Sequence, residues 1–207
     1  MNRSEDPTLF ESRKKDHIKW SLSEESQTHQ SPSSLLNLAH DAIPDLNFED
    51  IKITNFSKHF TNHKPLMVSS MTGGHEDSFK INKILTSACA KKNWLFAAGS
   101  MRKELELIDE DTKDSEWLSL DSDSTPLIGN LGVAQVLSHS TESILNLKKV
   151  YSLKGLFVHL NPLQEVIQTE GTPQFKGALE KIKTLKKAIE IPLFLKETGT
   201  GLSLIHI

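Results

Sequence analysis

The sequence has little cysteine: Cys89 is the single one among 207 residues. One cysteine excludes both an internal disulfide framework and a zinc site built from cysteines, and it is typical of a reducing compartment. We expect Cys89 to be a small buried residue of a helix. No apolar run approaches the roughly 18 residues of a membrane span, and the charged amino end from Met1 to Lys19 lacks the apolar core of a secretory signal. These absences predict a cytoplasmic protein with no membrane partner.

A surplus of positive charge is also absent. Lys and Arg number 24 against 27 Asp and Glu, which gives a formal net charge of -3. Proteins that bind nucleic acid through its phosphates expose an excess of basic residues, so this balance predicts no nucleic-acid partner. The length suits a single hydrophobic core.

What the sequence does have is a regular series of five short apolar runs. Each is dense in apolar residues without alternation, which is the pattern of a strand buried on both faces. The runs begin about 30 residues apart, the length of a strand, a helix and a return in a βαβ unit. They cover 65–69, 94–98, 126–130, 155–160 and 192–196.

Amphipathic stretches with apolar residues at helical spacing lie between these runs. One has Ile81, Ile84, Leu85 and Ala88 on one face, and two others cover 144–151 and 178–189. Strands that alternate with helices predict a parallel α/β sheet with right-handed crossovers.

Two parallel architectures fit this alternation, an open dinucleotide-binding sheet and a closed barrel. The open sheet usually carries G-x-G-x-x-G after its first strand, whereas Gly73 and Gly74 stand here without a third glycine in register. Polar residues lie at or just after the end of each of the five runs, as the active-site rim of a (β/α)8 barrel requires. We therefore favour a (β/α)8 TIM barrel. Five strands cannot close a barrel of eight, so we expect one truncated after about five strands and incomplete at its carboxyl end.

The chain divides into four expected segments. Residues 1–34 are rich in Ser, Glu, Lys and Gln and predict a flexible N-terminal arm. Residues 35–64 form an N-terminal cap segment and 65–201 the partial barrel. The last six, 202–207, resemble the translated end of a cloning adapter and are expected to be a non-native tail.

Three groups of residues have the composition of a site. The paired glycines after the first run let backbone N–H groups approach a ligand, and Thr72 offers a hydroxyl, although a tight structural turn fits this motif equally well. The stretch 159–165 places an imidazole, two carboxamides and a carboxylate just beyond one strand. Lys196 ends an otherwise apolar run, where a buried cation is costly unless a negative group lies beside it.

Several motifs follow one another along residues 13–201. They are Arg13-Lys14-x-Asp16-His17, Ser69-Ser70-Met71-Thr72-Gly73-Gly74, Gly99-Ser100-x-Arg102, Asn130-Leu131-Gly132, His159-x-Asn161-x-x-Gln164-Glu165, and Lys196-Glu197-x-Gly199-x-Gly201. In this order and spacing they resemble the type 2 isopentenyl diphosphate isomerases.

The resemblance implies a flavin-dependent (β/α)8 barrel that interconverts isopentenyl and dimethylallyl diphosphate in isoprenoid biosynthesis, using FMN kept reduced by NADPH, and Mg2+. It implies that Gln164 is the catalytic residue, on the side of the substrate opposite the flavin. It implies that Glu165 is the Mg2+ ligand, and one carboxylate plus substrate phosphates is a usual magnesium arrangement. For the full-length protein we expect a small-molecule substrate and a homo-oligomer, and for the 207-residue chain itself no activity.

The resemblance also implies the binding residues. Those for the substrate are Arg13, Lys14, Ser100, Met101, Arg102, His159, Asn161 and Gln164, and those for the flavin are Ser70, Met71, Thr72, Ser100, Asn130 and Lys196. Lys196 would face the side of the flavin ring where reduction leaves negative charge, which supplies the partner that a buried cation needs. Met101 stands where the family usually has glutamine, and it cannot donate a hydrogen bond.

Two alternatives remain. One is another FMN-dependent barrel, an oxidoreductase of the α-hydroxy-acid oxidase type. The Arg13-Lys14 and Gln164-Glu165 pairs argue against it, since oxidation of a hydroxy acid needs neither. The other is a truncated product with no activity, or a binding module.

Overall fold

The structure is a computed structural model that describes residues 16, 18–20, 22–26, 37, 39–53, 57–73, 76–108, 116–120, 124–168, 171–199 and 202. Its centre is a five-stranded sheet in which every neighbouring pair of strands is parallel. The strands are β1 (Met67–Val68), β2 (Leu95–Ala97), β3 (Leu127–Gly132), β4 (Gly155–His159) and β5 (Leu193–Lys196).

The strands lie side by side in the order in which they occur along the chain, β1-β2-β3-β4-β5. An open dinucleotide-binding sheet reverses its strand order at a switch point, whereas a barrel keeps the order of the chain. The sequential order therefore confirms the predicted fold class: the described chain is a five-stranded part of a (β/α) barrel. Each predicted strand is present. The largest differences are at β1, which keeps only Met67 and Val68 of the predicted 65–69, and at β3, which runs two residues further than predicted.

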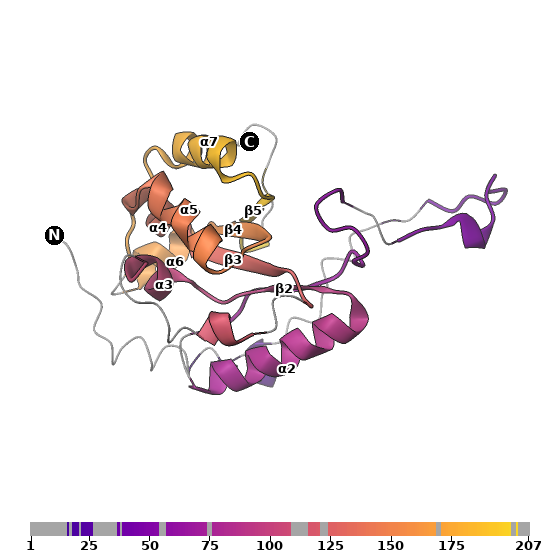
Figure 1. Cartoon of the computed structure of the whole chain (residues 1–207), viewed down its shortest axis with the longest axis horizontal. Coiled ribbons are helices and arrows are strands. Elements are labelled where there is room, and N and C mark those ends of the chain that lie inside the picture. The colour runs from indigo at the N-terminus through magenta and orange to yellow at the C-terminus, as the bar shows by residue number, and fades with distance from the viewer. Residues whose placement is uncertain are drawn as a thin grey trace.

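Helices connect the strands and cover one face of the sheet (Figure 1). The α-helices are α2 (Glu76–Lys92), α3 (Arg102–Glu106), α4 (Val133–Ser138), α5 (Thr141–Val150), α6 (Pro162–Ile167) and α7 (Ala178–Ile189), and the 3-10 turns are η1 (Glu24–Ser26), η3 (Phe48–Asp50) and η4 (Glu116–Ser119). α2, α5 and α7 confirm the three predicted helices, and the short α3, α4 and α6 were not predicted. None of the described helices is both long and apolar enough to cross a membrane.

Alternate residues of each strand face two different cores, because successive side chains of a strand point to opposite sides. On the helix-covered face, strand residues such as Phe96, Leu131 and Leu156 pack with helix residues such as Leu147 and Ile189. The opposite face has a smaller cluster, made of Phe60, Met67, Leu95, Ala97, Ile128, Phe157 and Phe194. We call this second surface the inner face.

The sheet is strongly curved around the inner face. Strands lie about 4.8 Å apart, so β1 and β5 would be about 19 Å apart in a flat sheet, beyond the reach of one lysine side chain. Yet Lys196 Nζ at the end of β5 lies 3.5 Å from the carbonyl oxygen of Ser70, two residues after β1. Phe60, which precedes β1, also stacks on Phe194 of β5 with ring centroids 6.4 Å apart. The curvature brings the ends of strands distant in the sheet around one shared space.

One predicted helix presents a different face from the expected one. α2 buries Ser78, Asn82, Thr86 and Cys89, while Ile84 is 70% exposed. The predicted apolar face is therefore only partly right: Leu85 packs against the helix-side core, whereas Ile84 does not. The buried, helical position of Cys89 is confirmed.

The described residues 39–53, which precede Phe60, contribute little to the cores. All described residues of 39–53 are exposed, and the stretch around η3 extends away from the sheet (Figure 1). Among the described residues of the predicted cap segment 35–64, Phe60 is the one that enters a core.

Candidate active site

Three polar side chains lie on the inner face at the carboxyl ends of β3, β4 and β5. His159 is two residues beyond Phe157, and Lys196 is two residues beyond Phe194, so each shares the inner face with that phenylalanine. Asn130 is in register with Phe157, and His159 is in register with Lys196. The three side chains therefore stand in adjacent layers of one surface, as the sequence predicted for the rim of a barrel.

Lys196 is a partly buried cation that points across the inner face. Burial lowers the pKa of its ammonium group below 10.5, because the charged form loses solvation. Its long contact to the Ser70 carbonyl places the ammonium between β5 and the loop that follows β1. A cation held this way favours a ligand that carries or gains negative charge.

His159 is held in one tautomer by the backbone. Its Nδ1 lies 3.1 Å from the carbonyl oxygen of Lys196, and because a carbonyl only accepts, Nδ1 carries the proton. Burial and, less strongly, the nearby Lys196 ammonium lower the pKa of His159 below 6.5, so the neutral imidazole is favoured. Nε2 is then the ring nitrogen that can accept a proton or a hydrogen bond.

Two buried oxygen atoms near this surface have no hydrogen-bond partner among the residues that the structure describes. They are Ser70 Oγ and Asn130 Oδ1, on residues that are 8% and 7% exposed. A buried polar atom without a partner is costly, and such atoms gather at ligand sites because a ligand can satisfy them. Together with Lys196, they suit a polar ligand that has both donor groups and negative charge.

Asn161 and Gln164 are joined at the start of α6. The side chain of Asn161 caps the helix by accepting from the backbone N–H of Gln164 at 3.2 Å. Its Nδ2 also donates to Gln164 Oε1 at 2.7 Å, which fixes the direction of the Gln164 carboxamide. The local sequence explains this geometry, since asparagine before proline is a favourable helix start.

Glu165 is oriented by the segment that follows α6. Its Oε2 accepts a hydrogen bond from the backbone N–H of Thr172 at 2.8 Å, and Gly171 lies so close to the Glu165 backbone that a Cβ there would collide with it. Among the described residues no group of three or more His, Cys, Asp or Glu could hold a metal by itself. A cation at Glu165 would therefore need oxygen atoms from a ligand as well.

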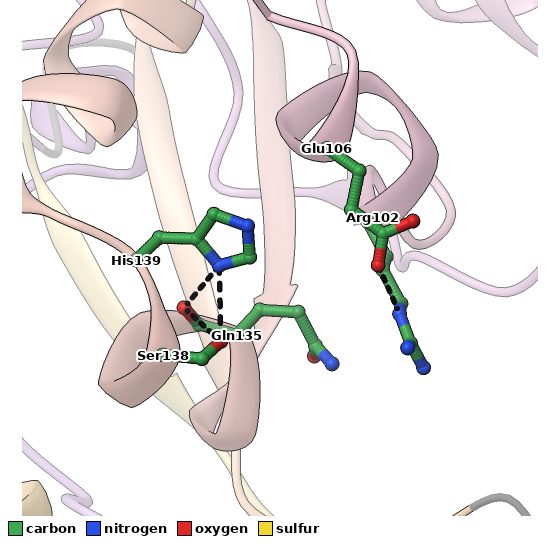
Figure 2. Close-up of polar contacts among 5 residues, drawn as sticks. All are labelled: Arg102, Glu106, Gln135, Ser138 and His139. Atoms are coloured by element: carbon green, nitrogen blue, oxygen red, sulfur yellow. Dashed lines mark hydrogen bonds and ion pairs between the residues drawn. The ribbon is translucent and has the colours of Figure 1, made fainter. Parts of the chain in front are cut away.

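Arg102 lies at the start of α3 and forms an ion pair within that helix. Its Nε is 2.7 Å from Glu106 Oε1, and its side chain is 24% exposed (Figure 2). The carboxylate fixes one edge of the guanidinium group, which directs the group along the helix. Ser100, two residues earlier, is partly exposed at the end of β2.

Two residues implied by the resemblance are placed where their side chains have other roles. Met101 is fully buried in the helix-side core, so its thioether offers no accessible surface to a substrate. The hydroxyl of buried Thr72 pairs with the hydroxyl of Ser78 at 2.9 Å. Met71, by contrast, is 52% exposed beside Ser70. Arg13 and Lys14 lie outside the described residues.

Gln135 is a polar residue near the rim that the sequence reasoning missed. Its Oε1 folds back over Gly132 so closely that a Cβ there would collide with it. Figure 2 shows its carboxamide extending toward the side where Arg102 and Glu106 lie. The sequence feature that could have indicated Gln135 is its position three residues after the Asn130-Leu131-Gly132 motif. His139, in the same view, closes the end of α4 through Gln135 O at 3.0 Å and is a structural histidine.

These features define an α/β protein of the barrel type, with a polar site at the carboxyl ends of its strands. No protein-family model matches the chain. Proteins named isopentenyl-diphosphate delta-isomerase are its homologues over nearly its whole length. The protein of that name from Legionella pneumophila (strain Paris) is 39% identical over 197 residues, which is 94% of this chain. Those from Bdellovibrio bacteriovorus and Halobacterium salinarum are 38% and 32% identical over 96% and 97% of it.

The chain spans little more than half of these relatives. It covers 57% of the Legionella protein, 58% of the Bdellovibrio protein and 56% of the Halobacterium protein. The similarity thus agrees with the resemblance read from the motifs, over the part that the chain covers.

Proposed function

We propose that the intact protein containing this chain interconverts isopentenyl diphosphate and dimethylallyl diphosphate by proton transfer, with FMN as cofactor, NADPH as its reductant and Mg2+ as metal. The observation that carries the reaction is the 39% identity, over 94% of the chain, to a protein named isopentenyl-diphosphate delta-isomerase. The same name favours this reaction over oxidation of a hydroxy acid.

The inner face supports a flavin as the cofactor. Ser70 and Asn130 offer buried oxygen atoms that lack a partner among the described residues, and Lys196 directs a cation to the same space. These groups would hold the polar edge of the flavin ring, and Lys196 would stabilise negative charge there. When bound, reduced FMN supplies the electron-rich group that proton exchange with an unactivated alkene requires.

Gln164 and Glu165 support the assignment of the remaining roles. The Asn161 side chain holds the Gln164 carboxamide in one orientation. Gln164 can therefore position or move a proton of the substrate without first having to select one rotamer among many. Glu165, held by Thr172, would bind Mg2+ together with substrate phosphate oxygens. Arg102 suits the same phosphates, and Arg13 and Lys14 stay predictions of the sequence.

The experiment is an isomerisation assay with the intact protein, isopentenyl diphosphate, FMN, NADPH and Mg2+. We expect turnover that requires the flavin, and we expect Gln164→Leu to reduce kcat by at least about a hundredfold, because the carboxamide that positions or moves the proton is then lost. Val166→Ala is a matched control, because Val166 is 63% exposed on the same helix. A wild-type protein with no isomerase activity, or a Q164L variant with normal turnover, would contradict the proposal.

The compartment, the oligomeric state and the lack of a nucleic-acid partner stay predictions of the sequence. So do the segment boundaries at 34, 64 and 201.

A further inference from the structure

The helix α2 buries polar residues where aliphatic ones would be expected. Ser78 is fully buried, and Asn82 and Thr86 are each 4% exposed, at a spacing of four residues along the side that faces the sheet. Serine, asparagine and threonine are weaker helix formers than alanine or leucine, and burying them requires hydrogen bonds. Helix formation alone therefore does not explain why these three residues are buried here.

Two of them hold the loop that follows β1. Asn82 Nδ2 donates to the carbonyl oxygen of Thr72 at 3.1 Å, and Ser78 Oγ pairs with Thr72 Oγ1 at 2.9 Å. Thr72 is 2% exposed, so these bonds lie in a buried environment where they are strong. The loop is thus attached to α2 through both the backbone and the side chain of one residue.

Gly99, which follows the next strand β2, packs closely against the same peptide. A Cβ at Gly99, just after β2, would collide with the Thr72 carbonyl group and the Gly73 nitrogen. The Thr72 peptide is therefore confined between the amide of Asn82 and a backbone that has no side chain. The Thr72 peptide cannot move without breaking its hydrogen bond to Asn82 or its contact with Gly99.

The residues just before this peptide are the ones that face the site. Ser70 has the Oγ without a described partner and provides a carbonyl oxygen 3.5 Å from the Lys196 ammonium, and Met71 is half exposed beside it. The position of these groups relative to β5 depends on where Thr72 is held. A small displacement of a binding group weakens its contacts strongly.

We propose that Asn82 and Ser78 are positioning residues that fix the 70–73 loop, so that Ser70 and Met71 are preorganised for the bound cofactor. Neither residue touches the cofactor itself, and both act through Thr72. That the cofactor is a flavin rests on the proposed function. That Asn82 and Ser78 fix the loop is independent of the proposed function.

The test compares Asn82→Ala with Thr125→Val in the intact protein. Both variants remove a buried hydrogen bond to or from α2, since Thr125 Oγ1 donates to Thr86 O at 3.3 Å, but Thr125 has no contact with the loop in this network. The measurements are the melting temperature, backbone hydrogen exchange in a peptide that covers 70–73, and the Kd for FMN from flavin fluorescence quenching.

We expect both variants to melt at a lower temperature than the wild type. Only N82A should exchange faster at 70–73 and raise the Kd for FMN by at least about tenfold. Equal exchange and equal FMN affinity in N82A and T125V would overturn the proposal, because the buried polar residues of α2 would then have a structural role only. Ser78→Ala is the milder variant for the same comparison if N82A does not fold.

Failure of this inference is distinguishable from failure of the proposed function. Hydrogen exchange at 70–73 needs no flavin, so it tests the loop whether or not the protein binds one. A wild type that binds no FMN contradicts the proposed function, whereas a wild type that binds FMN with an unaffected N82A variant contradicts the inference.

Discussion

At the scale of single residues, the site depends on backbone groups that hold side chains in one state. The Lys196 carbonyl fixes the His159 tautomer, the Gln164 amide fixes the Asn161 side chain, and the Thr172 amide fixes the Glu165 carboxylate. Backbone groups move little, so a side chain bound to one is preorganised without a large partner.

His159 should make stability depend on pH. Its pKa is lowered by burial, so between that lowered pKa and 6.5 the unfolded chain binds more protons than the folded one. Stability is then complete above about pH 6.5 and falls as the pH drops through the lowered pKa. We expect the melting temperature of the wild type to fall more between about pH 7 and pH 5 than that of His159→Gln. His59 lies on the exposed surface, so His59→Gln is the control. Its melting temperature should fall over this pH range as much as that of the wild type.

Asn161 should affect the stability of α6 and the orientation of Gln164 separately. Asn161→Ala removes the cap and should cost about 1 kcal/mol in the free energy of unfolding. Asn161→Asp keeps the oxygen that accepts from the Gln164 N–H but loses the donor to Gln164 Oε1. We expect N161D to unfold in urea as the wild type does, with a clearly lower kcat in the isomerase assay. A normal kcat for N161D would show that the carboxamide contact is irrelevant.

At the scale of elements, the close approach of neighbouring units decides which residues fit. The loop after β1 and the end of β2 meet at Gly99, and the strands β3, β4 and β5 meet at Gly155, where a Cβ would lie 3.0 Å from side-chain atoms of Ile128 and Phe194. The atoms that a Cβ at Gly99 would meet belong to the backbone, which cannot turn away. The atoms nearest to a Cβ at Gly155 are the ends of side chains, which can turn away.

Gly99→Ala should therefore destabilise the protein more than Gly155→Ala. We expect G99A to lose about 2 kcal/mol or more in the free energy of unfolding, in the range of overpacked cores, and G155A to lose less. Urea unfolding of both variants measures this difference. An equal loss would mean that the Thr72 peptide is free to shift, which would also weaken the case for its fixed position.

At the scale of the whole molecule, the described sheet has two open edges, β1 and β5. All residues of β5 are only partly buried, and α6 exposes Leu163, Val166 and Ile167 by 69%, 63% and 72%. Unpaired strand edges and exposed apolar groups favour association with other chains.

The 207 residues expressed alone should show the effects of these unpaired strand edges and exposed apolar side chains. We expect them to retain no FMN through gel filtration, because the described site has one curved sheet and no opposite wall, and to self-associate as concentration rises. The yellow absorbance of the eluted protein and light scattering measure these two properties. A monomeric, yellow 207-residue protein would contradict the expectation.

The sequence by itself determined the five strands, their spacing, and the polar residues at their carboxyl ends, because a strand buried on both faces has an apolar run that ends abruptly at the rim. Only the tertiary structure decided which face of α2 is buried and that Met101 lies in the core. Ile84 is apolar yet 70% exposed and Asn82 is polar yet 4% exposed, so apolar periodicity alone does not identify the buried face of this helix. The reason is that the burial of a polar side chain depends on a hydrogen-bond partner from another element, here the Thr72 carbonyl, and such a partner has no signature in the local sequence.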